Sequence, residues 1–475
     1  MVYGITFWKG GFFNMKNLAE TKRLPIMAGL LIGGFIGMFS ETALNIALAP
    51  LTTKLGVSTG TIQWLVIGYL LMVGILLPLS GLLTRWFTTR QLLIFALCDF
   101  IVGALIAALS SSFTFLFIGR LIQGVGTGIL LPLIFLVALA IYPLEKRGAA
   151  MGLIGLVIMF APAIGPTVAG LILGALSWQY IFWAMIPFLV IALVTTIIFT
   201  KNVMPITRPH VDALSICLST IGFGGVVLGI SLASDKGWTS PIVLGALVVG
   251  IVALFFFIRR QLKLPEPILN VKAFAHGGFS LGTGLVMIDF MIIMTSMYLL
   301  PIYWQKGLLV PVALTGMLML PGGIINAVVS SISGRLYDNF GARMPAMLGF
   351  LVSIIGALML FFGNADSSYL YVVFAHVILM IGAPLAMSPS QTHGLNALPQ
   401  QLSADGSSIM NTLQQICGAI ATALATSLLG VGEAASSAAG AAKVASGTRF
   451  GFALTVGLAV LGFLLTFALP RKQKA

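Results

Sequence analysis

Apolar runs of about 20 residues recur along almost the whole chain, each bounded by charged or turn-forming residues. A helix of that length crosses the hydrocarbon of a bilayer and satisfies its own backbone hydrogen bonds there. Of the 475 residues, 59% are hydrophobic and only 8% are charged, whereas soluble domains carry about 25% charged residues. The pattern therefore predicts an all-α polytopic membrane protein and excludes a soluble domain.

We predict about 14 membrane-spanning helices from these runs. An even number of spans places both chain termini on the same side of the membrane. The predicted spans are residues 26–50, 60–84, 91–110, 113–142, 147–175, 178–200, 211–233, 240–259, 278–301, 311–333, 345–363, 369–388, 405–430 and 450–470.

The basic residues predict the orientation. Most of the 25 lysines and arginines fall in the loops on the side of the termini, and the opposite side carries only Lys54, Lys236, Lys306, Lys443 and Arg449. Positive loops stay in the cytoplasm, so both termini are expected there. The net charge of +13 is explained by this asymmetry, and no stripe or motif predicts a nucleic-acid partner. The expected partner is the lipid bilayer, with the protein as a monomer.

Two loops resemble each other: "GLLTRWFTTR" (Gly81–Arg90) and "GRLYDNFGAR" (Gly334–Arg343). Each follows the second helix of a six-helix set, which predicts two related halves. The expected organisation is a cytoplasmic segment (1–25), an N-terminal six-helix lobe (26–200), a central linker with two extra transmembrane helices (201–274), a C-terminal six-helix lobe (275–470) and a cytoplasmic tail (471–475). The loop "GVGEAASSAAGAAKVASGTR" (430–449) is rich in Ala, Gly and Ser and predicts a flexible connector.

Four stretches carry a family resemblance. "GRLYDNFGAR" resembles the loop pattern of the major facilitator superfamily. "FIGRLIQGVGTG" (Phe117–Gly128) and "APAIGPTVAG" (Ala161–Gly170) are similar to fourth-helix and fifth-helix patterns of antiporters in that superfamily. "ETALNIALAP" (Glu41–Pro50) resembles the first-helix pattern of its 14-helix drug:proton antiporters. The chain is identified as a member of that family, nearest the lincomycin-resistance-type multidrug exporters.

The resemblance implies two six-helix lobes plus two inserted central helices. It also implies a secondary transporter in a bacterial cell membrane that exports small amphipathic drugs in exchange for protons, with no cofactor or metal besides the coupling proton. Two residues depart from the family's first loop, since Arg85 replaces an aspartate and Thr88 a glycine; Ala161 and Ala169 replace glycines of the fifth helix. The residues expected in gating and conformational motifs are Gly81, Arg85, Arg90, Gly165, Pro166, Gly334, Asp338, Gly341 and Arg343.

Glu41 is an acidic residue inside a predicted span, where a charge costs about 2.5 to 3.5 kcal/mol on insertion scales and therefore predicts a function. It lies roughly 14 Å from the outer end of its span, and Arg120 lies roughly 10 Å into another, by a rise of 1.5 Å per residue. An arginine that approaches or leaves a buried carboxylate changes its proton affinity. We therefore expect Glu41 to carry the proton and Arg120 to modulate it. The alternative is a permanent structural ion pair.

Asp289 lies near the middle of the predicted span 278–301 and is the second-half counterpart of Glu41. A carboxylate in a cavity binds either a proton or a cationic drug, so Asp289 is a second candidate for proton coupling. The alternative is a local hydrogen bond between helices. Asp99, in the span 91–110, is expected to pair with Arg85 or Arg90.

The substrate cavity is predicted from polar neighbours of the charges and from aromatic and Met residues. Asn45 and Gln123 lie one turn from Glu41 and Arg120 on the same helix faces, so they are expected to orient the charges or to touch substrate. The alternative for both is an interhelical packing hydrogen bond. Met and aromatic side chains suit an adaptable apolar pocket, although they are also common in ordinary cores. The predicted lining residues are Asn45, Gln63, Trp64, Tyr69, Gln123, Met294 and Tyr298.

Two other functions stay open at this point. A proton-coupled exporter of a physiological metabolite, lipid or peptide would use Glu41 in the same way. A membrane sensor or intramembrane enzyme predicts a sizeable soluble domain or a nucleophile constellation, and the loops supply neither. "GFSLG" (278–282) matches a nucleophile pattern but opens a predicted membrane helix rather than a strand-turn-helix elbow.

Overall fold

The computed structural model describes residues 23–142, 144–203, 206, 212–265, 267–399 and 402–470. These residues form fourteen long helices, which confirms the prediction of an all-α polytopic membrane protein. Thirteen are long and apolar enough to cross a membrane, and in α8 the apolar stretch found among the described residues is the shorter Phe160–Ala175. The long helices are α2 (Arg23–Ala43), α5 (Trp64–Trp86), α6 (Thr89–Leu109), α7 (Phe113–Ile141), α8 (Leu144–Ala175), α9 (Gln179–Phe199), α10 (Ala213–Lys236), α11 (Pro241–Lys263), α12 (Gly277–Ile302), α13 (Val312–Phe340), α14 (Arg343–Phe361), α15 (Tyr369–Asn396), α16 (Ser403–Ala435) and α17 (Gly440–Thr466).

Short elements interrupt or extend the long helices. The first predicted span is α2 continued by the 3₁₀ turn η1 (Leu44–Ala47) and by α3 (Leu48–Leu55), which ends at Gly56 with a left-handed φ of 64°. The remaining short elements are α4 (Thr59–Ile62), η2 (Val271–Ala275) and the π-helical turn η3 (Tyr303–Gly307).

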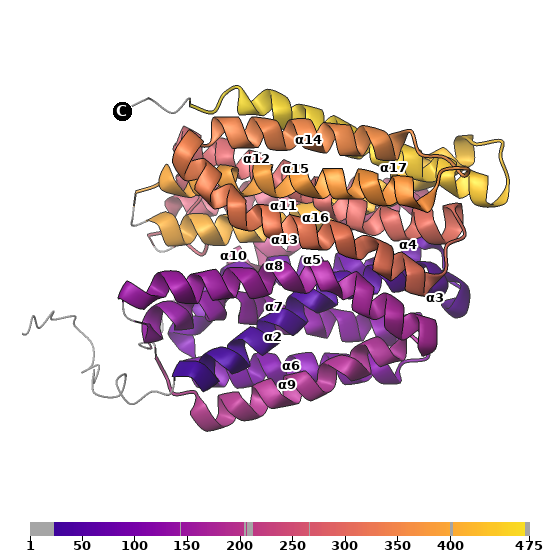
Figure 1. Cartoon of the computed structure of the whole chain (residues 1–475). Helices are drawn as coiled ribbons and strands as arrows, with labels where there is room; N and C mark the ends of the chain where they lie inside the picture. Colours follow the sequence, from indigo (N-terminus) through magenta and orange to yellow (C-terminus); the bar gives the residue numbers. More distant parts are fainter. Residues whose placement is uncertain are drawn as a thin grey trace, which may run out of the picture.

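The helices form two halves that lie side by side (Figure 1). The N-terminal half comprises α2 to α9, drawn from indigo to magenta in the lower part. The C-terminal half comprises α12 to α17, drawn from salmon to yellow above. The start of α2 and the end of α17 lie at the same end of the bundle, which we call the terminal end. The opposite end, which carries α3, α4 and η3, is called the far end.

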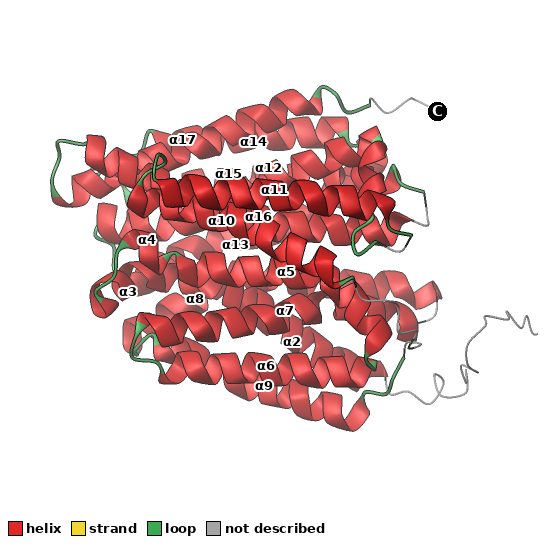
Figure 2. Ribbon diagram, turned by 180° about the vertical axis from the view of Figure 1, so that it is seen from behind, coloured by secondary structure: helices red, strands yellow, loops and turns green. Residues whose placement is uncertain are grey.

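The inserted helices α10 and α11 pack against each other and lie at the front in Figure 2, over α16 and α5. Glycines make this pair close, because a Cβ on Gly225 would lie 2.8 Å from the Cα of Gly250. At the far end, Trp238 Nε1 donates to Ser427 Oγ of α16 at 3.1 Å. The α10–α11 pair is therefore fastened by a side-chain hydrogen bond to the C-terminal half.

The two halves are joined at the far end by side chains of η3. Lys306 Nζ donates to Thr52 Oγ1 and Gln305 Nε2 donates to the Ile46 carbonyl, each at 3.0 Å. Further into the bundle, α8 packs on α13, and Gly316 lets the two backbones meet. The Gly316 carbonyl accepts a hydrogen bond from Thr167 Oγ1 at 2.8 Å. These contacts hold the far end of the bundle together across the halves.

The predicted flexible connector at 430–449 is wrong. Helix α16 continues to Ala435 and α17 begins at Gly440, so only residues 436–439 between them are not helical. Alanine is the strongest helix former, which explains why an Ala-rich segment extends both helices. Gly432 and Gly447 also bring the two helices into contact, with 2.9 Å from a Cβ on Gly432 to the Gly447 Cα.

Candidate functional site

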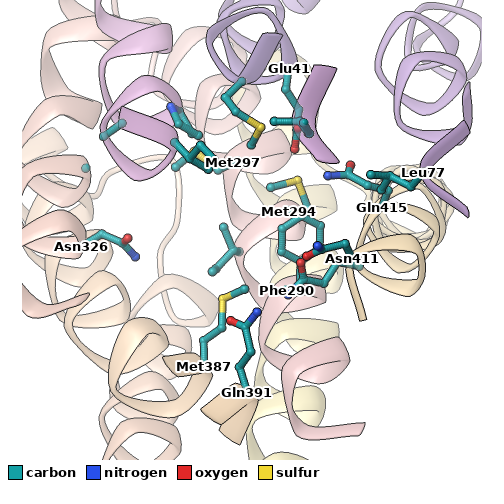
Figure 3. Close-up of a pocket in the computed structure, with 18 of the residues that line it drawn as sticks. Glu41, Leu77, Phe290, Met294, Met297, Asn326, Met387, Gln391, Asn411 and Gln415 are labelled. Carbon is teal, nitrogen blue, oxygen red and sulfur yellow. The ribbon is translucent and has the colours of Figure 1, made fainter. Parts of the chain in front are cut away.

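A cavity of about 390 Å³ lies between the two halves (Figure 3). It reaches from Glu41, in the last turn of α2, toward the terminal end, where Gln391 and Ser407 line it near the adjoining ends of α15 and α16. The wall is mostly apolar and rich in Met, with several carboxamides. It is formed by Met38, Glu41, Leu77, Leu131, Pro132, Phe135, Ile158, Pro162, Ala163, Phe290, Ile293, Met294, Met297, Gly323, Asn326, Met380, Met387, Gln391, Ser407, Asn411, Gln414 and Gln415.

Glu41 is the one ionisable side chain among these lining residues. It is 2% exposed, and its Oε2 has no hydrogen-bond partner. The Gln415 side chain, from α16 of the other half, is a hydrogen-bonding partner of the carboxyl group, and Figure 3 shows the two facing each other. A carboxyl group in such an apolar wall is suited to taking up and releasing a proton.

Arg120 is fully buried on α7, next to Glu41 in the interior of the N-terminal half. Its guanidinium donates to Ser40 Oγ at 2.6 Å, to Gln123 Oε1 at 3.0 Å and to the Leu65 carbonyl at 3.1 Å. It also lies over the Tyr69 ring, 4.1 Å from the centroid. Arg120 and Glu41 both lie in the part of the chain that the structure describes, and they make no salt bridge with each other. The alternative, a permanent ion pair between them, is therefore not present in this state.

Thr42 fastens α2 to α8 beside Glu41. Pro166 has no N–H, so the Pro162 carbonyl loses its helical donor, and Thr42 Oγ1 donates to that carbonyl at 3.1 Å. Gly165 permits the approach, because a Cβ there would lie 3.1 Å from the Phe39 carbonyl oxygen. The Gly-Pro sequence of α8 therefore gives close packing against the residues that flank the cavity carboxyl.

Comparison with known proteins identifies the family. The family model described as Major Facilitator Superfamily matches residues 30–214 and 212–422. The chain belongs to the major facilitator superfamily. It is similar to the lincomycin resistance protein LmrB of Bacillus subtilis (strain 168), with 48% identity over 96% of this chain and 98% of that protein. It is also similar to the multidrug export protein EmrB of Haemophilus influenzae (strain ATCC 51907 / DSM 11121 / KW20 / Rd), with 27% identity over 87% of this chain and 83% of that protein.

Solved structures of the superfamily share the fold. A partially occluded inward-open structure of the xylose transporter XylE from E. coli matches with a TM-score of 0.63 and 15% identity, over 95% of this chain and 99% of that one. An auto-inhibited POT-family peptide transporter matches with a TM-score of 0.70 and 13% identity, over 96% and 99%. The fold predicted from the resemblance is therefore confirmed, and the chain is a transporter of this superfamily rather than an enzyme.

Of the residues predicted to line the substrate cavity of this superfamily member, Met294 lies in its wall. Tyr69 does not line the cavity, because its hydroxyl is held by Thr127 Oγ1 and the Gly37 carbonyl, both at 2.8 Å. Gln123 is fully buried and accepts from Arg120. These two residues support the arginine inside the N-terminal half instead of facing the cavity.

Four more predictions of cavity lining are corrected. Asn45 is buried in η1 and Gln63 is buried just before α5. Both lie between Glu41 and the far end of the bundle, outside the cavity wall. Trp64 packs edge-on against the Phe117 ring at a centroid distance of 6.3 Å, and Tyr298 is buried on α12 outside the wall. Neither spacing from Glu41 nor aromatic character indicates which way these side chains point.

Asp289 is fully buried on α12, and neither carboxyl oxygen has a hydrogen-bond partner. Its neighbours Phe290 and Ile293 line the cavity, but Asp289 does not. Its expected place in the cavity wall is therefore wrong, and its role in proton coupling stays a prediction. Asp99 also differs from expectation, because its carboxyl contacts the Gly126 backbone of α7, while Arg90 donates to the Ile197 carbonyl at 2.8 Å.

The two predicted motif loops both lie at the terminal end. In the second loop, Gly334 has open space beside it, Gly341 ends α13 with a φ of 73°, and Arg343 stacks on the Phe467 ring at 5.6 Å. Asp338 lies in the last turn of α13. In the first loop, Gly81 likewise has open space beside it, and Arg85 lies in the last turn of α5.

Sequence reasoning missed the carboxamides of the cavity. Asn326, Gln391 and the α16 residues Asn411, Gln414 and Gln415 all line it. Amides inside apolar helices are costly to bury unless they find partners, so "NTLQQ" (411–415) within a predicted span was a usable signal.

Proposed function

We propose that this transporter is a proton-coupled antiporter that exports amphipathic compounds from the cytoplasm by alternating access. The observation that carries the proposal is the cavity itself. Its wall is apolar, adaptable and Met-rich, and Glu41 is the one ionisable group among its described lining residues. The similarity to proteins named for lincomycin resistance and multidrug export supports the same substrate class.

The expected topology assigns the terminal end to the cytoplasm. The cavity then faces the cytoplasm, while the hydrogen bonds of Lys306 and Gln305 join the outer end. In this inward-facing state a substrate enters past Gln391 and Ser407 and reaches Glu41. Substrate capture accompanies loss of the Glu41 proton to the cytoplasm, and protonation from outside returns the empty carrier.

Exchange follows because one carboxyl cannot serve both ligands at once. The protonated carboxyl is neutral and tolerates the apolar wall, whereas the carboxylate needs a compensating group, which a cationic substrate supplies. Exchange of one proton for one monovalent cation moves no net charge, so the membrane potential does not drive it, whereas exchange for a neutral compound gains about 2.3 kcal/mol per 100 mV of membrane potential. In both cases the proton also enters down the pH gradient. This entry contributes about 1.36 kcal/mol per unit of pH gradient.

The test is export of lincomycin and of ethidium from bacterial cells that express the protein, with and without a protonophore. We expect the wild type to export at least one compound, the protonophore to stop it, and Glu41→Gln to fail while reaching the membrane in equal amount. Export that continues under the protonophore, or in the Gln variant, overturns the proposal. Failure with both drugs but proton-coupled export of a cell metabolite would favour a physiological substrate.

A further inference from the structure

The α16 face of the cavity carries two adjacent carboxamides with unpaired atoms. Gln414 and Gln415 are 8% and 6% exposed, so both are more than nine-tenths buried. Gln414 Nε2, a donor, and Gln415 Oε1, an acceptor, have no hydrogen-bond partner. Buried polar atoms are hydrogen-bonded in the large majority of cases, so an unpaired pair on a cavity wall indicates a place for a ligand group.

Glu41 holds one member of this pair in place. The Gln415 side chain is a hydrogen-bonding partner of Glu41, which restricts its rotation and leaves Oε1 as its unpaired atom. Asn411 also lines the cavity and lies one helical turn before Gln414 and Gln415 on α16. Figure 3 shows Asn411 and Gln415 on the same side of the cavity, with Glu41 opposite Gln415.

We infer that Gln414 and Gln415 form a polar subsite that takes a hydroxyl or amide group of the substrate beside Glu41. Gln414 supplies a free donor and Gln415 a free acceptor on the same cavity wall. Together they match a ligand group that both accepts and donates, and hydroxyl and secondary amide groups do both. The subsite is a specificity element of the proposed antiporter and rests on that proposal. Most of the remaining wall is apolar and Met-rich and accepts the remainder of the molecule by shape.

The subsite predicts that its removal weakens the binding of one cation and not of another. Lincomycin carries an amide, several hydroxyl groups and a basic amine, whereas tetraphenylphosphonium carries no hydrogen-bonding group. A typical hydrogen bond contributes roughly 0.5–1.5 kcal/mol, which corresponds to about a 2-fold to 12-fold change in binding. Removing the subsite therefore weakens lincomycin binding and leaves tetraphenylphosphonium binding in place.

The experiment uses the full-length protein in proteoliposomes and compares wild type, Gln414→Leu, Gln415→Leu and the double variant. For each variant, KM and maximal rate are measured for both cations, and binding of labelled lincomycin is measured on the purified protein. We expect KM for lincomycin to rise about 5-fold in Gln414→Leu and at least 10-fold in the double variant, from the loss of one and two hydrogen bonds. For Gln414→Leu, the KM and the maximal rate of tetraphenylphosphonium transport should change less than about 2-fold, which also shows that this variant is folded and coupled.

Equal loss of both cations, or no change for either, overturns the subsite. Gln414→Leu is the decisive variant because Gln415 also touches Glu41 and its loss can disturb coupling. Failure of the proposed function looks different. In that case the wild type still binds lincomycin, and Gln414→Leu still weakens binding, but no proton gradient drives transport.

Discussion

Arg120 donates its shortest hydrogen bond, at 2.6 Å, to the hydroxyl of Ser40, the residue immediately before the cavity carboxyl Glu41. The arginine is fully buried and does not line the cavity. It therefore affects Glu41 through Ser40 and through its charge in the protein interior, and not by direct contact with a substrate. Its contacts with Ser40, Leu65 and Tyr69 join α2, α5 and α7 in one place. The geometry makes Arg120 a fixed positive charge that holds the end of α2.

We predict that Arg120→Lys is severely destabilising. A lysine ammonium is a single point donor and cannot reach Ser40, Gln123 and the Leu65 carbonyl in the fork geometry of a guanidinium. Losing two such bonds to a buried charge costs about 3 kcal/mol or more. The thermal midpoint of the purified protein should fall by several degrees. Ser40→Ala removes only one acceptor and should cause a smaller fall; an equal or larger fall would contradict this account.

We predict that Thr42→Val destabilises the packing of α8 on α2 by about 1 to 2 kcal/mol, because it leaves the Pro162 carbonyl without a donor. The change keeps the shape of the side chain and removes only the hydroxyl. The measurement is the thermal midpoint of the purified variant together with its maximal export rate.

Pro166→Ala provides the control for this bond. Alanine restores the N–H that a helix donates to the Pro162 carbonyl, so the hydroxyl of Thr42 becomes redundant. Thr42→Val should therefore cost much less in the Pro166→Ala background than in the wild type. Additive effects of the two substitutions would show that the hydroxyl does not serve this carbonyl.

Asp212, just before α10 and outside the spanning helices, gives a prediction about pH. Arg260 donates to its two carboxyl oxygens at 2.7 and 2.8 Å, and this lowers the pKa of Asp212 to about 2. A lowered pKa in the folded state stabilises the protein above the unfolded pKa, which is about 3.9. That stabilisation is lost as the pH falls toward about 2. Asp212 therefore stays ionised between pH 6 and 8, roughly the range of export assays.

Asp212→Asn should thus lower stability slightly at neutral pH, by about 1 kcal/mol or less because the pair is partly exposed. The difference from wild type should disappear in strong acid. The pH profile of export between pH 6 and 8 or so should keep its shape, whereas Glu41→Gln should abolish proton-driven export. A shifted profile in Asp212→Asn would mean that α10 takes part in coupling. These outcomes are read from denaturation midpoints and export rates across pH.

The fold could be predicted because each membrane-spanning helix is determined by its own stretch of sequence. The length and polarity of each apolar run decide whether a helix spans the bilayer, and neither depends on distant residues. The same holds for the backbone hydrogen bonds that α8 lacks, since Pro162 and Pro166 have no N–H to donate in any context. The first motif loop also follows local chemistry. Thr88 begins α6 with a capping box to Gln91, where the second loop uses Gly341 at positive φ.

The cavity wall could not be predicted in the same way. Consecutive helical residues point about 100° apart, so a residue next to a cavity residue often faces another helix. Asp289 and Phe290 are such a pair, because only Phe290 lines the cavity. Tyr69 was expected in the cavity for its aromatic character, but its place is set by Gly37 and Thr127 on two other helices. Tertiary contacts of this kind are not encoded in spacing along one span.

The far-end contacts of η3 predict the last variant, Lys306→Met. Lys306 reaches Thr52 across the two halves, and its loss removes one charged hydrogen bond worth about 1.5 to 3 kcal/mol. In the proposed cycle, the state with these far-end contacts should therefore lose population relative to the outward-facing state by roughly 10-fold or more. The readout is labelling of a cysteine at cavity position Met38 by a membrane-impermeant thiol reagent added outside, with Cys98, Cys217 and Cys417 replaced by serine. Labelling should become faster in Lys306→Met.

Lys54→Met is the control, because it removes the same charge from an exposed site on α3 and should leave the labelling rate unchanged. Equal acceleration in both variants would assign the effect to surface charge instead of the contact of Lys306 with Thr52.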